Sequence, residues 1–130
     1  MWTDDPVFDH FEQNMDGVTV RGDAWRRATL IKEANPGAKV VKVVGTAFRR
    51  SKKGIEAAMR IPNPQVTLVP EPENLTDPNA VRVLVGYAHG SAGHFIGYLP
   101  KGSCIPADSR AHILKMGSYP NPNLCICVEA

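Results

Sequence analysis

Hydrophobic and polar residues follow two different periods along this chain of 130 residues. Val81, Val83 and Val85 alternate with Arg82 and Leu84, and short apolar or β-branched runs occur elsewhere, bounded by Gly, Pro and Asn. Period-two alternation places successive side chains on opposite faces and predicts half-buried strands. The pattern therefore predicts strands over residues 40–48, 65–69, 81–85, 94–99 and 124–128.

The last of these strands is apolar on both faces. Leu124, Ile126 and Val128 would point to one side, and Cys125 and Cys127 to the other. A strand with two apolar faces must be covered on both. We therefore expect residues 124–128 to be buried inside a barrel or under a helix.

Helical spacing appears near the N-terminus. Ala24, Ala28 and Ile31 recur on one face, Asp23 is a good N-cap residue, and Asn-Pro-Gly at 35–37 ends the pattern. These signals predict a helix over residues 24–34, preceded by mostly irregular chain over residues 1–22.

A second helix is predicted near the C-terminus, because Pro106 suits a helix start and residues 107–115 follow it up to Gly117. Between the predicted strands, residues 51–54 read as a turn and residues 119–123 as a loop. Residues 55–60 are too few to decide between helix and strand.

Short strands, glycine-rich corners and few helices indicate a mainly β (α+β) protein. We expect a small OB-like or SH3-like β-barrel with about two flanking helices. The barrel domain would span residues 39–130, after an N-terminal extension with one helix over residues 1–38. A chain of this length can bury a core without disulfides or metals.

Composition excludes several function classes. No run approaches the ~20 apolar residues of a membrane span, and the first residues are acidic where a signal peptide would be basic. We therefore expect a cytoplasmic protein without membrane partners. Three cysteines, two of them on a predicted strand, favour small buried hydrophobes over a disulfide framework or a metal site. Motifs for a P-loop, a nucleophile elbow or a zinc protease are missing from the sequence, so we expect no catalysis and no cofactor.

The net charge of +2 hides an uneven distribution. Residues 1–16 hold five acids and no Lys or Arg, whereas residues 39–60 hold one acid and seven bases. This basic stretch is either an ordinary solvated face or a surface that binds phosphates.

The most informative segment runs from Glu71 to Val83, with the sequence Glu-Pro-Glu-Asn-Leu-Thr-Asp-Pro-Asn-Ala-Val-Arg-Val. Its prolines restrict the backbone, and its Asn and Asp side chains can bind nearby N–H groups. Local sequence alone leaves open whether this rigid polar loop is only a turn or also a binding site.

The flanking motifs bear on that question. Val-Val-Gly-Thr-Ala-Phe at 43–48 precedes the segment, and Phe-Ile-Gly-Tyr-Leu-Pro at 95–100 follows it. Together, in this order, the three motifs resemble the HIRAN family over residues 40–114. HIRAN modules are small β-barrels found at the N-terminus of certain DNA-remodelling helicases and as stand-alone bacterial proteins.

The resemblance implies capture of a single-stranded DNA 3′ end. In this family an aromatic ring after the Val-Gly motif stacks on a base, and Phe48 holds that position here. Asn74 and Asp77 match the residues around the terminal nucleotide, where the Asp accepts a hydrogen bond from the 3′-hydroxyl. Lys101 matches a basic residue that contacts phosphate.

Two positions depart from the family pattern. Thr76 stands where a second aromatic ring is usual, and Ala47 where helicase-type members carry Arg. Arg49 and Arg50 offer charge in compensation, and Tyr98 or Tyr119 offers a ring.

The residues themselves fit the same chemistry, because a groove for single strands needs cations for phosphates and π-faces for bases. We predict a non-catalytic module that recognises single-stranded DNA 3′ ends in DNA repair or at replication forks. The alternatives are a protein-interaction module and a small-nucleotide-binding barrel, and steep salt dependence would favour nucleic acid. The candidate binding residues are Phe48, Arg49, Arg50, Lys52, Asn74, Thr76, Asp77, Tyr98, Lys101 and Tyr119.

Overall fold

A computed structural model describes residues 12–88, 93–106, 108–116 and 124–129. Over these residues the protein is α+β, with ten elements in the order β1 Glu12–Met15, β2 Val18–Arg21, α2 Gly22–Ala34, β3 Lys39–Lys42, α3 Arg49–Ala58, β4 Gln65–Pro70, β5 Val81–Gly86, β6 His94–Tyr98, β7 Ala111–Lys115 and β8 Cys125–Val128. The strands form three antiparallel sheets, ordered β1-β2, β3-β8-β7 and β4-β5-β6.

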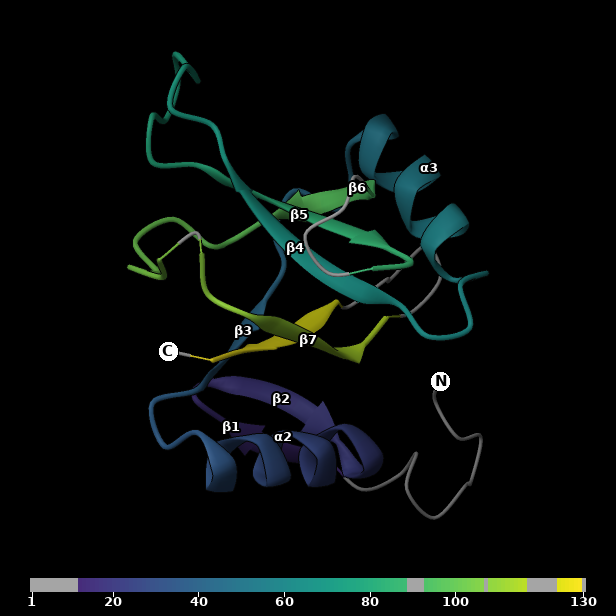
Figure 1. Cartoon of the computed structure of the whole chain (residues 1–130), viewed down its shortest axis with the longest axis vertical. Helices are drawn as coiled ribbons and strands as arrows, with labels where there is room; N and C mark the ends of the chain where they lie inside the picture. The colour runs from purple at the N-terminus through teal and green to yellow at the C-terminus, as the bar shows by residue number, and fades with distance from the viewer. Residues whose placement is uncertain (1–11, 89–92, 107, 117–123, 130) are drawn as a thin grey trace.

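The main core lies between the two three-stranded sheets and extends under α3 (Figure 1). Val83, Val85 and Ile96 come from β5 and β6, and Ile126 and Val128 come from β8. Ile55 of α3 joins them and is fully buried, so α3 is part of the core rather than a surface addition.

A second core lies on the other face of the β3-β8-β7 sheet. Val20, Ala24 and Ala28, from β2 and α2, pack there against Cys125 and Cys127. Burial raises the pKa of both thiols, that of Cys127 to about 11. The prediction that β8 is covered on both faces is confirmed, with the cysteines acting as small hydrophobes.

The predicted strands over residues 65–69, 81–85 and 94–99 are confirmed as β4, β5 and β6. Helix α2 confirms the predicted helix over residues 24–34, although Asp23 is not its N-cap. The N-cap is Arg21, and Asp23 lies in the first turn, with its carboxylate 3.8 Å from the Arg27 guanidinium.

The closed barrel is not detected in the described residues. β3 ends at Lys42, the Val43 N–H still donates to the Leu124 carbonyl beside β8, and the isolated bridge between Val44 and Tyr98 then links the chain to β6. The expected strand over residues 40–48 is therefore shorter than predicted, and α3 begins at Arg49.

The second helix was predicted in the wrong place. Residues 111–115 form β7, which pairs with β8 through a register shift between Ile113 and Lys115. Ordinary alternation places Ile113 in the main core and Leu114 in the second one, and after the shift Met116 faces the main core again. Pairing with β8 and burial on two sides override the helical signal of Pro106.

Residues 51–54, expected to be a turn, lie inside helix α3. Ser51, Gly54, Ile55 and Ala58 are buried at helical spacing, and the charged residues between them face outward. Residues 55–60, for which the sequence leaves helix and strand open, begin as helix and end in a turn.

The N-terminal region is also more regular than expected. β1 and β2 form a hairpin whose turn is Asp16-Gly17, with positive φ at both residues (52° and 78°). Asp-Gly between two paired strands is a strong signal for this turn. Gly117, near which the predicted second helix was to end, and the loop predicted at 119–123 lie outside the described residues. No helix among the described residues is both long and apolar enough to cross a membrane.

Candidate nucleic-acid interface

The loop between β4 and β5, residues 71–80, is fixed by its own polar groups. The backbone N–H of Glu71 donates to the carbonyl of Ala80 and so continues the β4–β5 pairing. Asn74 Oδ1 accepts the backbone N–H groups of Thr76 (2.9 Å) and Asp77 (3.0 Å). Asn74 thus acts as the internal cap of a tight turn, as its side chain is suited to do.

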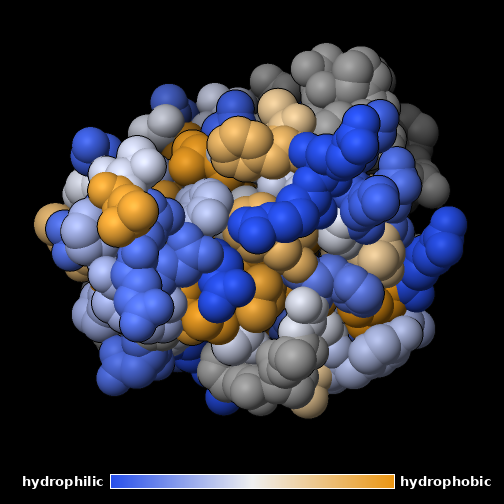
Figure 2. All heavy atoms as spheres, turned by 90° about the horizontal axis from the view of Figure 1, so that it is seen from above, coloured by the Kyte–Doolittle hydropathy of each residue, from blue (hydrophilic) through white to orange (hydrophobic). Residues whose placement is uncertain are grey.

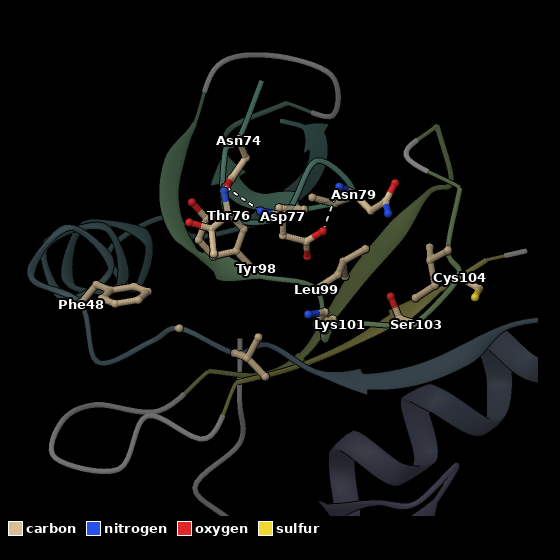
Figure 3. A pocket seen from close by; sticks show the side chains of 16 residues that line it. Phe48, Asn74, Thr76, Asp77, Asn79, Tyr98, Leu99, Lys101, Ser103 and Cys104 are labelled. Atoms are coloured by element: carbon tan, nitrogen blue, oxygen red, sulfur yellow. Dashed lines mark hydrogen bonds between the residues drawn. The ribbon is translucent and has the colours of Figure 1, made fainter. Parts of the chain in front are cut away.

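Asp77 continues this arrangement. Its Oδ1 accepts the backbone N–H of Asn79 at 3.0 Å, and its backbone carbonyl accepts that of Ala80. Figure 3 draws this bond from Asn79 to Asp77 and the bond from the Asp77 N–H to Asn74 Oδ1. One carboxylate oxygen therefore holds the loop, while the second takes no part in the hydrogen bonds among the described loop residues.

Glu71 connects the loop to the sheet. Its Oε1 accepts hydrogen bonds from Asn74 Nδ2 (3.0 Å) and from the Tyr98 hydroxyl (3.1 Å). Its Oε2 lies 3.1 Å from Arg82 Nε, an ion pair in which the N–H is not directed at the oxygen. One carboxylate thereby fixes the positions of Asn74 and Tyr98, two of the predicted site residues.

Gly45 forms the base of the aromatic part of the site. It has a φ of +71°, and a Cβ placed on it would lie 3.1 Å from the Phe48 ring and 3.4 Å from the Tyr98 ring. The carbonyl of Gly45 accepts a 2.7 Å hydrogen bond from the hydroxyl of Ser51, a fully buried side chain of α3. A glycine here lets both rings pack over the backbone and ties the turn to the helix.

Tyr98 is held by backbone as well as by Glu71. Its N–H and carbonyl exchange hydrogen bonds with the carbonyl and N–H of Val44, at 2.8 and 2.9 Å. The preceding residue, Gly97, lies so close to this segment that a Cβ would be 2.4 Å from the Val44 carbonyl oxygen. The glycine of the Ile-Gly-Tyr motif is therefore needed for the close approach of β6 to the backbone of Val44.

These segments enclose a pocket of about 960 Å³. Figure 3 shows Phe48 on one side, the 71–80 loop on another, and Lys101 and Ser103 below Asp77. Seen from the end that carries α3 and this loop, the surface has apolar side chains exposed between hydrophilic ones (Figure 2). The pocket is lined by Val44, Gly45, Phe48, Asn74, Thr76, Asp77, Asn79, Ala80, Val81, Tyr98, Leu99, Lys101, Gly102, Ser103, Cys104 and Ile105.

Most of the predicted site residues meet in this pocket although they come from three separate segments of the chain. They are Phe48, Asn74, Thr76, Asp77, Tyr98 and Lys101. Phe48 is 59% exposed at the start of α3, so its ring is accessible to a ligand in the pocket.

The predicted cations of α3 lie beside the pocket rather than in its lining. Arg49 and Arg50 are exposed in the first turn of the helix, directly after Phe48, and Lys52 is exposed one residue beyond Ser51. The Arg50 guanidinium stacks 4.4 Å above the Phe95 ring, which in turn meets Tyr98 edge-on at 5.2 Å. Their contact with phosphates stays a prediction. Tyr119 lies outside the described residues.

Sequence reasoning missed two kinds of site residue. In the sequence Glu71 is only the first residue of the polar 71–83 segment, and nothing there indicates that it holds both Asn74 and Tyr98. The wall formed by Leu99, Ser103 and Ile105 depends on how the chain after β6 folds back, which no local pattern specifies. Among the described residues, no group of three or more His, Cys, Asp or Glu side chains is arranged to hold a metal ion.

A preformed pocket with an exposed ring, a carboxylate and a lysine on a small α+β scaffold defines a binding module. The HIRAN domain profile matches residues 36–105, more than half of the chain, so the protein belongs to the HIRAN domain family, whose members are in general DNA-binding modules. All the pocket-lining residues fall within the match, whereas β7 and β8 lie beyond it. No curated protein and no solved structure matches the chain significantly.

Proposed function

We propose that this protein is a non-catalytic module that binds single-stranded DNA at its 3′ end, in DNA repair or at replication forks. The observation that carries the proposal is the shared pocket of Phe48, Asp77 and Lys101. A π-face, a hydrogen-bond acceptor and a cation are the three groups that a terminal nucleotide needs for its base, its free hydroxyl and its phosphate.

Asp77 is the residue that would distinguish chain ends. With Oδ1 committed to Asn79, the other oxygen is available to accept a hydrogen bond from a 3′-hydroxyl. A 3′-phosphate offers negative charge instead and would be repelled by the carboxylate. The Asp77 N–H donates to Asn74 Oδ1, and the Asp77 carboxylate accepts the Asn79 N–H. These bonds hold the group in place before the ligand arrives, which lowers the entropic cost of binding.

Thr76 stands where the family usually has a second aromatic ring, and Tyr98 offers a ring elsewhere in the same pocket. The Tyr98 hydroxyl is fixed by Glu71 and its backbone by Val44, so its ring is a rigid part of the pocket. We propose that Tyr98 supplies part of the apolar surface that a ring at Thr76 would give. Arg49 and Arg50, at the positive end of the α3 dipole, would add attraction for phosphates.

Replacing Phe48 with alanine should weaken binding of a single-stranded 3′-hydroxyl oligonucleotide by ~5- to 150-fold, because stacking on an aromatic ring is worth ~1–3 kcal/mol per base. Fluorescence anisotropy at fixed salt measures this change. The Phe48→Tyr variant is the matched control, since it keeps the π-face and should bind like the unchanged protein. Equal affinities for the Ala variant and the unchanged protein would remove Phe48 from the site.

The extension proposed over residues 1–38 is physically joined to the rest. Its helix α2 and hairpin β1–β2 form the second core with β3 and β8. The boundary at residue 38 stays a prediction, and it lies close to the start of the family match at residue 36.

A further inference from the structure

A second groove lies beside the pocket, along β3. It has a volume of about 640 Å³ and is bordered by the β1–β2 turn on one side and the 100–103 segment on the other. Its floor is apolar, with Val18, Val41 and Pro100, and its charged groups are Asp16, Lys39 and Lys42. β3 is the edge strand of its sheet, so this face has no neighbouring strand in the β3-β8-β7 sheet to cover it.

The two hollows adjoin each other. Val44 and Ser103 line both of them, and Val44 is 41% exposed. In Figure 3 the blue ribbon of β3 passes directly below Lys101 and Ser103. A ligand that extends from the pocket past the exposed side chain of Val44 would therefore reach the second groove.

The charge of the second groove suits an anionic chain. Lys39 and Lys42 are both exposed, at the two ends of β3. The opposing charge of Asp16 is already used within the fold, because Asp16 Oδ2 accepts hydrogen bonds from Lys32 Nζ (2.6 Å) and from the Val40 N–H (2.9 Å). Burial alone would raise the pKa of Asp16, but these bonds and the lysine charges hold it below its usual value. Lys39 lies close enough to Asp16 to help lower its pKa, but among the described residues neither Lys39 nor Lys42 forms the hydrogen bond or ion pair that Lys32 forms with this carboxylate.

We propose that the second groove holds the continuation of the same DNA strand, the nucleotides that lie 5′ of the captured 3′ end. Lys39 and Lys42 would contact their phosphates, and the apolar floor would contact sugars and bases. Only a ligand longer than one nucleotide reaches both hollows, and a polynucleotide alternates anionic and apolar groups as the groove does. This inference rests on the proposed function, since it extends the strand from the pocket.

The test compares two lengths of DNA with a free 3′-hydroxyl, a trinucleotide and a decanucleotide, on the full chain. The Lys39→Gln/Lys42→Gln variant should bind the decanucleotide about 2- to 30-fold more weakly than the unchanged protein, from two exposed phosphate contacts. Its plot of log affinity against log salt should be shallower by about 1.4. Its affinity for the trinucleotide should change by less than about twofold if that ligand stays within the pocket.

The matched control is the Arg60→Gln/Arg110→Gln variant, which loses the same charge from exposed side chains that line neither hollow. It should keep the affinity of the unchanged protein for both lengths. An equal loss of affinity in both double variants, or an equal loss on both DNA lengths, would overturn the proposal that the second groove binds DNA. It would indicate instead a general effect of the protein's positive charge. Unchanged decanucleotide binding in the Lys39→Gln/Lys42→Gln variant would also overturn it. Absence of binding by the unchanged protein would instead refute the proposed function, and the extension with it.

Discussion

Replacing Asp77 with asparagine is expected to abolish discrimination between a 3′-hydroxyl and a 3′-phosphate end. A hydrogen bond to a charged acceptor is worth ~1.5–3 kcal/mol, so the unchanged protein should prefer the hydroxyl end by ~10- to 150-fold. Asparagine keeps an oxygen that can accept the Asn79 N–H and hence preserves the turn. It removes the negative charge and places a donor in the pocket, which favours phosphate. Competition binding with the two oligonucleotides measures the ratio.

The Asn74→Ala variant separates this chemistry from the shape of the loop. Asn74 Oδ1 caps Thr76 and Asp77, so its loss should loosen the loop and weaken binding to both ends. The ratio of the affinities for the 3′-hydroxyl and 3′-phosphate ends should then fall less than in the Asp77→Asn variant. A preserved preference for the hydroxyl end in Asp77→Asn would show that Asp77 does not read the terminus.

Replacing Gly54 with alanine is expected to destabilise the fold, although alanine is the better helix former. A Cβ at this position would lie 1.7 Å from the carbonyl oxygen of Phe95, which is backbone and cannot move aside cheaply. Overpacking costs ~1–3 kcal/mol, and the contact with backbone places this case in the upper part of that range, ~2–3 kcal/mol. The gain in helix propensity of ~1 kcal/mol offsets only part of it. We expect a net loss of roughly 1–2 kcal/mol and a fall in Tm of roughly 4 °C or more.

The same substitution should weaken DNA binding, because α3 carries Phe48 and Arg49 at its start and would have to move away from β6. Thermal unfolding and anisotropy on one preparation measure both effects. Glu56→Ala is the control, since Glu56 is exposed on the same helix and its loss should be nearly neutral. A Tm at or above that of the unchanged protein would contradict the close packing of α3 on β6.

The sequence predicts those parts of the fold in which local pattern and tertiary packing agree. The alternation of Val81, Val83 and Val85 is the pattern of a strand with one buried face, and β5 is such a strand. The double apolar face of 124–128 indicates that both sides of β8 are covered, and α2 and the opposite sheet cover them.

The misplaced elements are those whose signals depend on contacts far along the chain. Gly54 looks like a turn residue, yet its role is to let α3 touch β6, and only the position of Phe95 reveals this. The 111–115 segment has no strong period, and its pairing with β8 decides that it is a strand. The β1–β2 turn is different, because Asp16-Gly17 carried a usable signal that the weak periodicity around it obscured.

For the site, the motifs locate the residues, but they do not show which residues hold the loop and which are open to a ligand. Asn74 was predicted to surround the ligand, and the structure shows that its side chain first holds the loop. Glu71 has no role in the sequence pattern, but it fixes Asn74 three residues away and Tyr98 27 residues away along the chain. Such a network forms only when β4 and β6 are brought together through β5, so the sequence alone does not show it.

The most direct test of 3′-end capture is fluorescence anisotropy on three labelled decanucleotides: single-stranded DNA ending in a 3′-hydroxyl, the same strand ending in a 3′-phosphate, and a blunt duplex. End capture predicts tightest binding to the 3′-hydroxyl strand, with affinity that falls steeply as salt rises. Equal, salt-sensitive binding to both single strands would contradict end recognition and leave a general single-strand binder. Absence of binding to all three would contradict nucleic-acid binding altogether and indicate a protein or small-nucleotide ligand for the pocket.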